Sequence, residues 1–76
     1  MFILAKNSWE RHESSSTTVL AVASTVEALR EHAKQFGCYP EMWEADNTCI
    51  TFEESCLNGT GVCAQDCYYI EPVKAV

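Results

Sequence analysis

The chain has 76 residues, of which 47% are hydrophobic, and it carries a net charge of −6. This length predicts a single domain over residues 1–76, and the apolar fraction excludes a disordered chain. No apolar run approaches the ~20 residues that a membrane-spanning helix needs. Residues 1–5 are apolar but end at Lys6 without a basic segment before them, so we expect a strand rather than a signal peptide, and a cytoplasmic location.

Two strands are expected in the first third of the chain. Residues 2–6 are apolar, and residues 17–23 are rich in β-branched side chains. Between them, residues 8–16 show no hydrophobic period and end in three consecutive serines, which predicts a polar loop. The two segments should therefore pair as an antiparallel hairpin with a long loop.

A helix is predicted over residues 25–36. Ser24 and Glu27 match a capping box, in which the Ser24 hydroxyl accepts from the Glu27 backbone N–H and the Glu27 side chain reaches back. Gly37 can take the left-handed conformation that ends a helix, and Pro40 prevents continuation. The side chains expected to face the core recur every three or four residues: Val26, Leu29, Ala33 and Phe36.

A second hairpin is predicted from segments 42–46 and 49–53, which flank the turn Asn47-Thr48. Side chains alternate between the two faces of a strand, so the residues on each face can be assigned. The side chains expected in the core are Trp43, Ala45, Ile50 and Phe52. Those expected on the opposite face are Glu44, Asp46, Thr51 and Glu53.

The last predicted strand covers residues 67–71. A loop marked by Gly59 and Gly61 precedes it, and Pro72, which lacks a backbone N–H, ends it or places it at an edge. The resulting order is β-β-α-β-β-β. We therefore expect the α+β class, with an antiparallel sheet of about five strands and one α-helix packed on one face.

No enzyme and no cofactor are expected. Nucleophilic catalysis needs a base held beside a Cys or Ser, but His12 lies in the serine-rich loop and His32 lies off the apolar stripe of the helix. The segment Asn58-Gly59-Thr60-Gly61 lacks the Lys of a phosphate-binding loop.

Five cysteines, none of them in a C-x-x-C pair, leave three interpretations open. The favoured one is that the loop cysteines stay reduced while Cys49 and Cys67 pack as small apolar side chains. A disulfide between Cys56 and either Cys63 or Cys67 would close a short loop. The third is a metal or redox module built from Cys56, Cys63 and Cys67 with His12 or His32.

Acidic side chains are the first candidates for binding. Residues 35–73 contain no Lys or Arg, so we expect no direct contact with nucleic acid or anionic membrane, and a basic partner instead. The alternative is a solvated acidic surface that keeps a small protein soluble. The acidic candidates are Glu41, Glu44, Asp46, Glu53 and Glu54.

Aromatic side chains outside the core are the second candidates, because such residues often anchor interfaces. Tyr68 and Tyr69 are consecutive in a strand, so one should face the core and the other should face outward. Trp9 lies in the polar loop, where it either contributes to binding or covers one end of the sheet.

The layout resembles that of very small α+β proteins coded by phages and mobile elements. The resemblance rests on Phe2-Ile3-Leu4 directly after Met1, on the helix start Ser24-Thr25-Val26-Glu27-Ala28, and on the closing Tyr68-Tyr69-Ile70-Glu71-Pro72-Val73. Some of these are anti-CRISPR proteins, acidic inhibitors that occupy the basic nucleic-acid surface of a CRISPR effector. The resemblance implies a phage-encoded inhibitor that acts in the host cytoplasm on a basic host protein or nucleoprotein complex.

The leading hypothesis is therefore a non-enzymatic acidic binding protein that blocks a basic nucleic-acid-binding surface. Two alternatives remain. One is a small structural or regulatory module that dimerises through an edge strand. The other is the cysteine-based metal or redox module.

Overall fold

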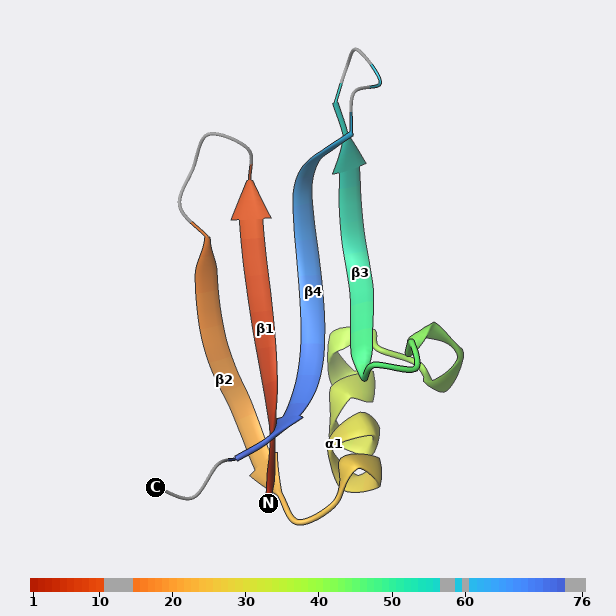
Figure 1. The fold of residues 1–76 in the computed structure, drawn as a ribbon. Helices are drawn as coiled ribbons and strands as arrows, with labels where there is room; N and C mark the ends of the chain where they lie inside the picture. The colour runs from red at the N-terminus through yellow and green to blue at the C-terminus, as the bar shows by residue number, and fades with distance from the viewer. Residues whose placement is uncertain (11–14, 57–58, 60, 74–76) are drawn as a thin grey trace.

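The computed structural model describes residues 1–10, 15–56, 59 and 61–73. Within them, four strands form one antiparallel sheet in the spatial order β2-β1-β4-β3 (Figure 1). The strands are β1 (Phe2–Glu10), β2 (Ser16–Ala23), β3 (Thr48–Ser55) and β4 (Val62–Pro72). One helix, α1 (Val26–Ala33), follows β2. The α+β class, the antiparallel sheet and the first hairpin are confirmed, but the described strands number four rather than about five.

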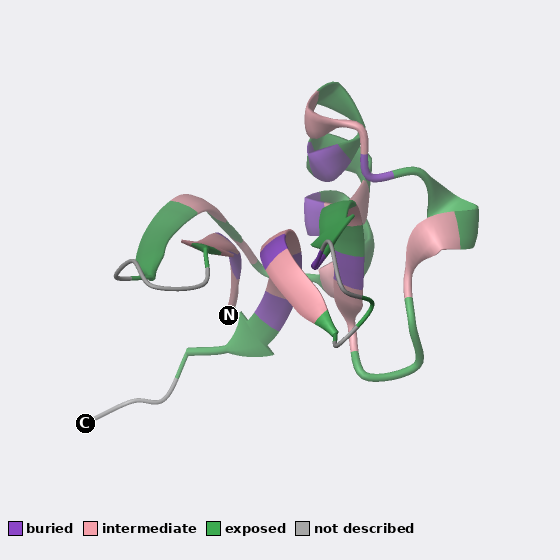
Figure 2. Cartoon of the chain, turned by 90° about the horizontal axis from the view of Figure 1, so that it is seen from above, coloured by how far each residue is buried: buried purple, intermediate pink, exposed green. Residues whose placement is uncertain are grey.

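The register assigns the side chains of the sheet to two faces, because directly opposite residues of antiparallel strands point to the same side. One face, here called the helix-side face, carries Leu4 opposite Ile70. Both belong to the core cluster that includes Leu29 and Ala33 of α1. The other face, here called the open face, carries Ala5 opposite Tyr69. Figure 2 shows α1 on one side of the sheet, and among the described residues no helix or strand covers the other side.

The core lies at the end of the sheet where the chain begins. Leu29 and Ala33 are four residues apart, so they share one side of α1 and pack on the sheet. Cys38, which follows the 3-10 turn after the helix, and Cys49 of β3 are also buried members of the core. The remaining buried members of this cluster come from β1 and β4: Leu4, Tyr68 and Ile70.

The helix begins one residue later than predicted. Thr25, not Ser24, is the N-cap: it has extended φ and ψ of −133° and 153°, and its Oγ1 accepts from the Ala28 backbone N–H at 3.2 Å. Ser24 and Glu27 therefore do not form the predicted capping box, because Ala28, not Glu27, stands three residues after the cap. A 3-10 turn, η1 (Lys34–Phe36), extends the helix.

The end of the helix is as predicted, because Gly37 has a φ of 89°, in the left-handed region. No helix in the described part of the chain is long and apolar enough to cross a membrane.

The predicted hairpin over residues 42–53 is wrong. Residues 42–46 form no strand; Pro40 instead starts a short 3-10 helix, η2 (Pro40–Met42), and a turn leads into β3. β3 pairs with β4, so the strand predicted at residues 67–71 begins earlier, at Val62. β4 is thereby an inner strand, and Pro72 ends it rather than marking an edge.

Contacts with the helix hold residues 43–46 away from the sheet, whereas the Asn47 carbonyl already accepts from the Ile70 N–H of β4 at 3.0 Å. The Arg30 guanidinium lies over the Trp43 ring, 5.3 Å from its centroid, and donates to Asn47 Oδ1 at 2.6 Å. Asn47 has a φ of 62°, a conformation that Asn tolerates better than most residues. The Glu44 N–H donates to the Thr48 carbonyl, which completes the turn. These contacts connect α1 to the start of β3, and local strand propensity does not reveal them.

The predicted facing of β3 is also wrong. Cys49 is fully buried opposite Tyr68, whereas Ile50 is 43% and Phe52 is 49% exposed. A bulge between Ile50 and Phe52 places them on different faces: Ile50 opposite Cys67 on the open face, and Phe52 opposite Asp66 on the helix-side face. Trp43 packs partly buried against the core, while Ala45 is exposed.

Candidate functional site

The helix covers only part of the helix-side face (Figure 1). In Figure 1 the hairpin of β3 and β4 continues well beyond the end of α1. We call the part of the sheet beyond α1, on both of its faces, the open end; it comprises residues 8–10 of β1, 52–55 of β3 and 64–66 of β4. The open end exists because the strands are longer than the helix: β1 and β4 have 9 and 11 residues, whereas α1 has 8. At a rise of about 1.5 Å per residue in a helix and 3.3 Å in a strand, α1 is too short to cover them.

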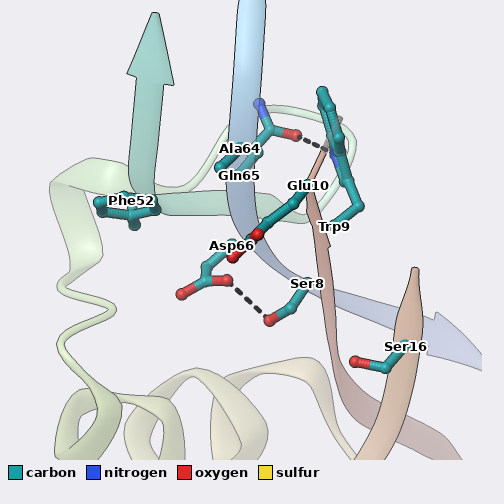
Figure 3. A pocket seen from close by; sticks show the side chains of 8 residues that line it. All are labelled: Ser8, Trp9, Glu10, Ser16, Phe52, Ala64, Gln65 and Asp66. Carbon is teal, nitrogen blue, oxygen red and sulfur yellow. Dashed lines mark hydrogen bonds between the residues drawn. The ribbon is translucent and has the colours of Figure 1, made fainter. Parts of the chain in front are cut away.

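A shallow pocket of about 270 Å³ lies at this open end (Figure 3). Its lining combines two carboxylates, two hydroxyls, one amide and two aromatic side chains. The residues that line it are Ser8, Trp9, Glu10, Ser16, Phe52, Ala64, Gln65 and Asp66. A site of this composition suits a group with an apolar stem and a cationic head, which describes the side chains of Lys and Arg.

The register explains why acidic side chains gather here. Glu10, Ala64 and Glu54 lie in one row across β1, β4 and β3 on the helix-side face. With strands about 4.8 Å apart, the Cα atoms of Glu10 and Glu54 are about 10 Å apart. Asp66 lies in the next row, two residues further along β4. Three acidic residues therefore surround the small side chain of Ala64.

Asp66 is held in place by two polar contacts. The Ser8 hydroxyl donates to Asp66 Oδ1 at 2.7 Å, as Figure 3 shows. Lys6 Nζ lies 3.8 Å from Asp66 Oδ2 and 5.6 Å from the centroid of the Tyr68 ring. Because the side chains of Lys6 and Asp66 are each about one third exposed, the pair is partly screened by water. Lys6 marks the boundary between the covered core and the open end.

On the opposite face, a chain of polar contacts crosses the same strands. The Trp9 Nε1–H donates to Gln65 Oε1 at 3.4 Å, and Gln65 Nε2 donates to Glu53 Oε2 at 3.1 Å. Trp9 is partly buried within β1, so it belongs to the sheet rather than to the loop in which we expected it. This arrangement links β1, β4 and β3 where the helix gives no support.

The five acidic candidates do not form one patch. Glu53 and Glu54 lie at the open end, on opposite faces because they face Gln65 and Ala64 respectively. The others lie before the start of β3: Glu41, Glu44 and Asp46. Thr48 and Glu53 are five residues apart, about 17 Å along a strand. The expected surface of Glu44, Asp46 and Glu53 on one hairpin face is therefore wrong. Asp46 instead accepts from the Thr48 hydroxyl at 2.6 Å.

The two consecutive tyrosines point to opposite faces, as predicted. Tyr68 is 5% exposed and stacks on Phe36, with ring centroids 5.8 Å apart. It is part of the core, so its place among the binding candidates is not supported by the geometry. Tyr69 lies on the open face and is partly buried.

Sequence reasoning missed Glu10, Asp66 and Phe52. Glu10 and Asp66 belong to strands that continue beyond the predicted limits of residues 2–6 and 67–71. The alternation of Lys6, Ser8 and Glu10 with Ala5, Asn7 and Trp9 could have revealed the longer first strand. The bulge that turns Phe52 toward the helix-side face left no signal in the sequence.

The cysteines divide into a disulfide and three thiols. Cys56 and Cys63 form a disulfide with Cα atoms 5.1 Å apart, which overturns the preference for reduced loop cysteines and leaves neither sulfur free to ligate a metal. Cys38, Cys49 and Cys67 are free. Burial, aided by a hydrogen bond with the Cys49 side chain, raises the pKa of Cys38 to about 12. Burial also raises the pKa of Cys67. Such thiols are poor nucleophiles at neutral pH.

Metal ligation by other residues has no geometric support either. Among the described residues, no group of three or more His, Cys, Asp or Glu side chains is arranged to hold a metal ion. His12, one of the two histidines considered as ligands, lies outside the described residues. His32 is exposed on α1, where its ring contacts Gln35 and Phe36.

Comparison with known proteins adds no further evidence: the chain matches no family model, no curated protein and no solved structure.

Proposed function

We propose that this protein is a non-enzymatic binding protein whose acidic open end accepts basic side chains from the surface of a protein partner. The observation that carries the proposal is the row of Glu10, Ala64 and Glu54 beside Asp66 and the half-exposed Phe52. Carboxylates hydrogen-bond strongly to Arg and Lys, and an exposed ring packs against their aliphatic stems. The net charge of −6 further favours encounter with a basic surface.

Glu10 and Glu54 also suit this role because their carboxylates take part in no ion pair among the described residues. The ion pairs in that part of the chain are Lys6–Asp66 and Lys34–Glu31. Arg11 follows Glu10 in the sequence and lies outside the described residues. Carboxylates without a role in the core are free to pair with a partner's cations.

The resemblance to small anti-CRISPR proteins selects the first partner to test, the basic nucleic-acid-binding surface of a CRISPR effector in the host cytoplasm. An inhibitor that occupies this surface competes with the target DNA and does not itself bind nucleic acid. The expected result is stoichiometric loss of DNA binding by the effector when the protein is added.

Two matched charge variants test the site itself. Glu10→Gln with Glu54→Gln removes two negative charges at the open end, and Glu41→Gln with Glu44→Gln removes two at the other end of β3. Capture of basic proteins from host lysate identifies the partner, and titration against the purified partner then measures affinity. We expect the first variant to weaken binding at least tenfold and the control to change it by less than about threefold, because short-range pairs outweigh diffuse charge.

The loss should shrink as salt rises, since the Debye length falls from about 10 Å at 0.1 M to about 3 Å at 1 M. Equal weakening by both variants would show that only net charge matters and would contradict the open-end site. Unchanged binding in both would exclude acidity as the basis of recognition.

A further inference from the structure

The two edges of the sheet differ in how they are protected. β2 and β3 are the outer strands, and among the described residues β2 pairs with β1 alone. In an edge strand, every other residue turns its backbone N–H and C=O away from the sheet. These groups form a template on which another strand can add, so proteins commonly guard such edges with charges, prolines or covering segments.

β3 is guarded. Glu53 and Glu54 place two negative charges near its end. The Glu44 N–H donates to the Thr48 carbonyl at 2.8 Å, so the preceding loop already occupies the beginning of the outer edge.

β2 lacks these charges and covering contacts. Residues 15–26 contain no charged residue, no Pro and no Gly, in a chain with a net charge of −6. Val19 and Val22 are 56% and 54% exposed, although β2 contributes Leu20, Ala21 and Ala23 to the packing around the core. Two half-exposed valines on an uncharged edge strand are a feature of strands that add to another strand.

The register of β1 with β2 brings the two valines to one face. Val22 lies opposite Ile3 and Val19 lies opposite Ala5, and the irregularity between Leu4 and Ala5 accounts for the extra residue in β2. Ile3 and Ala5 are two residues apart, so both point to the open face, and so do their partners. Val19 and Val22 therefore form an apolar strip along the edge, three residues apart in the sequence but on the same side.

We propose that β2 is a homodimer interface, in which the β2 strands of two copies pair in antiparallel orientation to form one continuous sheet. A two-fold axis between Leu20 and Ala21 places Val19 opposite Val22 of the second copy, and Val22 opposite its Val19. The same strip thus meets itself, as a two-fold interface requires. Cross-strand pairs of β-branched residues are favourable, and each copy then covers the other's exposed valines.

The charge distribution permits a second copy as the occupant, and the strip that matches itself about the two-fold axis selects it. Two chains of charge −6 repel each other, so they associate only through a surface that holds no acidic residue, and β2 is such a surface. Glu53 and Glu54 lie on the other edge strand, separated from β2 by β1 and β4.

A pairing of single strands is a small interface, below about 1,200 Å² in total, which is typical of weak association. Sedimentation equilibrium at micromolar to millimolar protein concentrations is therefore the measurement. The expected mass rises with concentration from 8.5 kDa toward twice that value. Hydrogen exchange at the same concentrations should show protection of the β2 amides that grows with concentration, and no such change in β3.

Charge variants test the register. Val19→Lys with Val22→Lys, and separately Val19→Glu with Val22→Glu, place like charges opposite each other across the axis, so each variant should remain monomeric at every concentration. Mixed in equal amounts, the two variants should form a heterodimer, because each Lys then meets a Glu. This rescue shows that the single variants are folded. Ile50→Lys, an exposed apolar residue on the guarded edge, is the matched control and should dimerise like the parent.

A parent protein that remains at 8.5 kDa throughout would overturn the proposal, and would leave β2 to a strand of a different protein. So would dimerisation of either charged variant by itself, absence of the mixed heterodimer, or loss of the dimer in Ile50→Lys. The interface is separate from the acidic open end, so variants at Glu10 and Glu54 test the proposed function without affecting this result.

Discussion

The sheet has a covered end and an open end, and they differ in what holds them together. At the covered end, Leu4, Leu29 and Ile70 are at most 5% exposed and pack against one another between sheet and helix. At the open end, no helix of the described part of the chain covers either face, and the strands are joined by backbone hydrogen bonds, the Trp9–Gln65–Glu53 contacts and the Cys56–Cys63 disulfide. The difference teaches that stability and recognition are separated along the strands.

The separation has a physical reason. A carboxylate near an apolar core must be paired or solvated, because burying an unpaired charge is costly. Beyond the end of α1, no core requires apolar neighbours, so Glu10, Glu54 and Asp66 are tolerated close together. A small protein has too little apolar area to cover a whole sheet, and the uncovered part is where it can carry a binding surface.

The largest expected effect distinguishes the two ends directly. Leu29→Ala should lower the free energy of unfolding by about 3 kcal/mol, since it removes a fully buried side chain and leaves a cavity. Phe52→Ala at the open end should cost less than about 1 kcal/mol, because the ring is 49% exposed. Urea denaturation followed by far-UV circular dichroism measures both. A larger loss for Phe52→Ala than for Leu29→Ala would remove the distinction between the ends.

Removal of the disulfide should have the next largest effect, and it tests whether the open end unfolds separately from the covered end. Replacing Cys56 and Cys63 by Ala should lower the free energy of unfolding by on the order of 2 kcal/mol. The value is at the low end of the usual range because the bridge closes a loop between residues only seven apart. We expect hydrogen exchange to increase at residues 52–55 and 64–66 and to change little in α1. A uniform increase across the chain would show instead that the two ends unfold as one unit.

The third prediction concerns the N-cap of α1, which belongs to the covered end. Thr25→Ala should lower the free energy of unfolding by about 1 kcal/mol, because the Ala28 N–H loses its acceptor. Ser24→Ala is the matched control and should change it by less than about 0.5 kcal/mol. Thermal melts of both variants show which residue caps the helix. A larger loss of stability in Ser24→Ala than in Thr25→Ala would identify Ser24 as the N-cap.

The smallest effect is the pH dependence that Cys38 gives to the covered end. Its pKa is raised from 9.0 to about 12, so the folded state holds this proton while the unfolded state loses it. The stabilisation is complete below pH 9.0 and is lost as pH rises toward 12. The free energy of unfolding should therefore fall less steeply above pH 9.0 in Cys38→Ala than in the parent.

The difference between the two slopes reports the contribution of Cys38 together with its interactions with Cys49 and Cys67. Equal slopes would contradict the burial of a protonated Cys38. As a second readout, a thiol reagent at neutral pH should modify Cys38 only after unfolding, since the side chain is fully buried.

The sequence by itself determined the elements that local chemistry specifies. Alternation and β-branched residues located the first hairpin, the spacing of Val26, Leu29 and Ala33 located the helix, and Gly37 ended it. The signs and positions of the charges gave the acidic character of the C-terminal half. These features depend on neighbouring residues, so a single sequence is enough to predict them.

The tertiary structure alone decided which strands pair and where the helix stops covering them. The Arg30 contacts with Trp43 and Asn47 keep residues 43–46 away from the sheet, and β3 pairs with β4 instead of with that segment. The bulge in β3 turns Phe52 toward the pocket. The candidate site depends on both, because Glu10 comes from the first strand whereas Glu54 and Asp66 come from the last two. Long-range pairing sets their distances, and no local pattern records it.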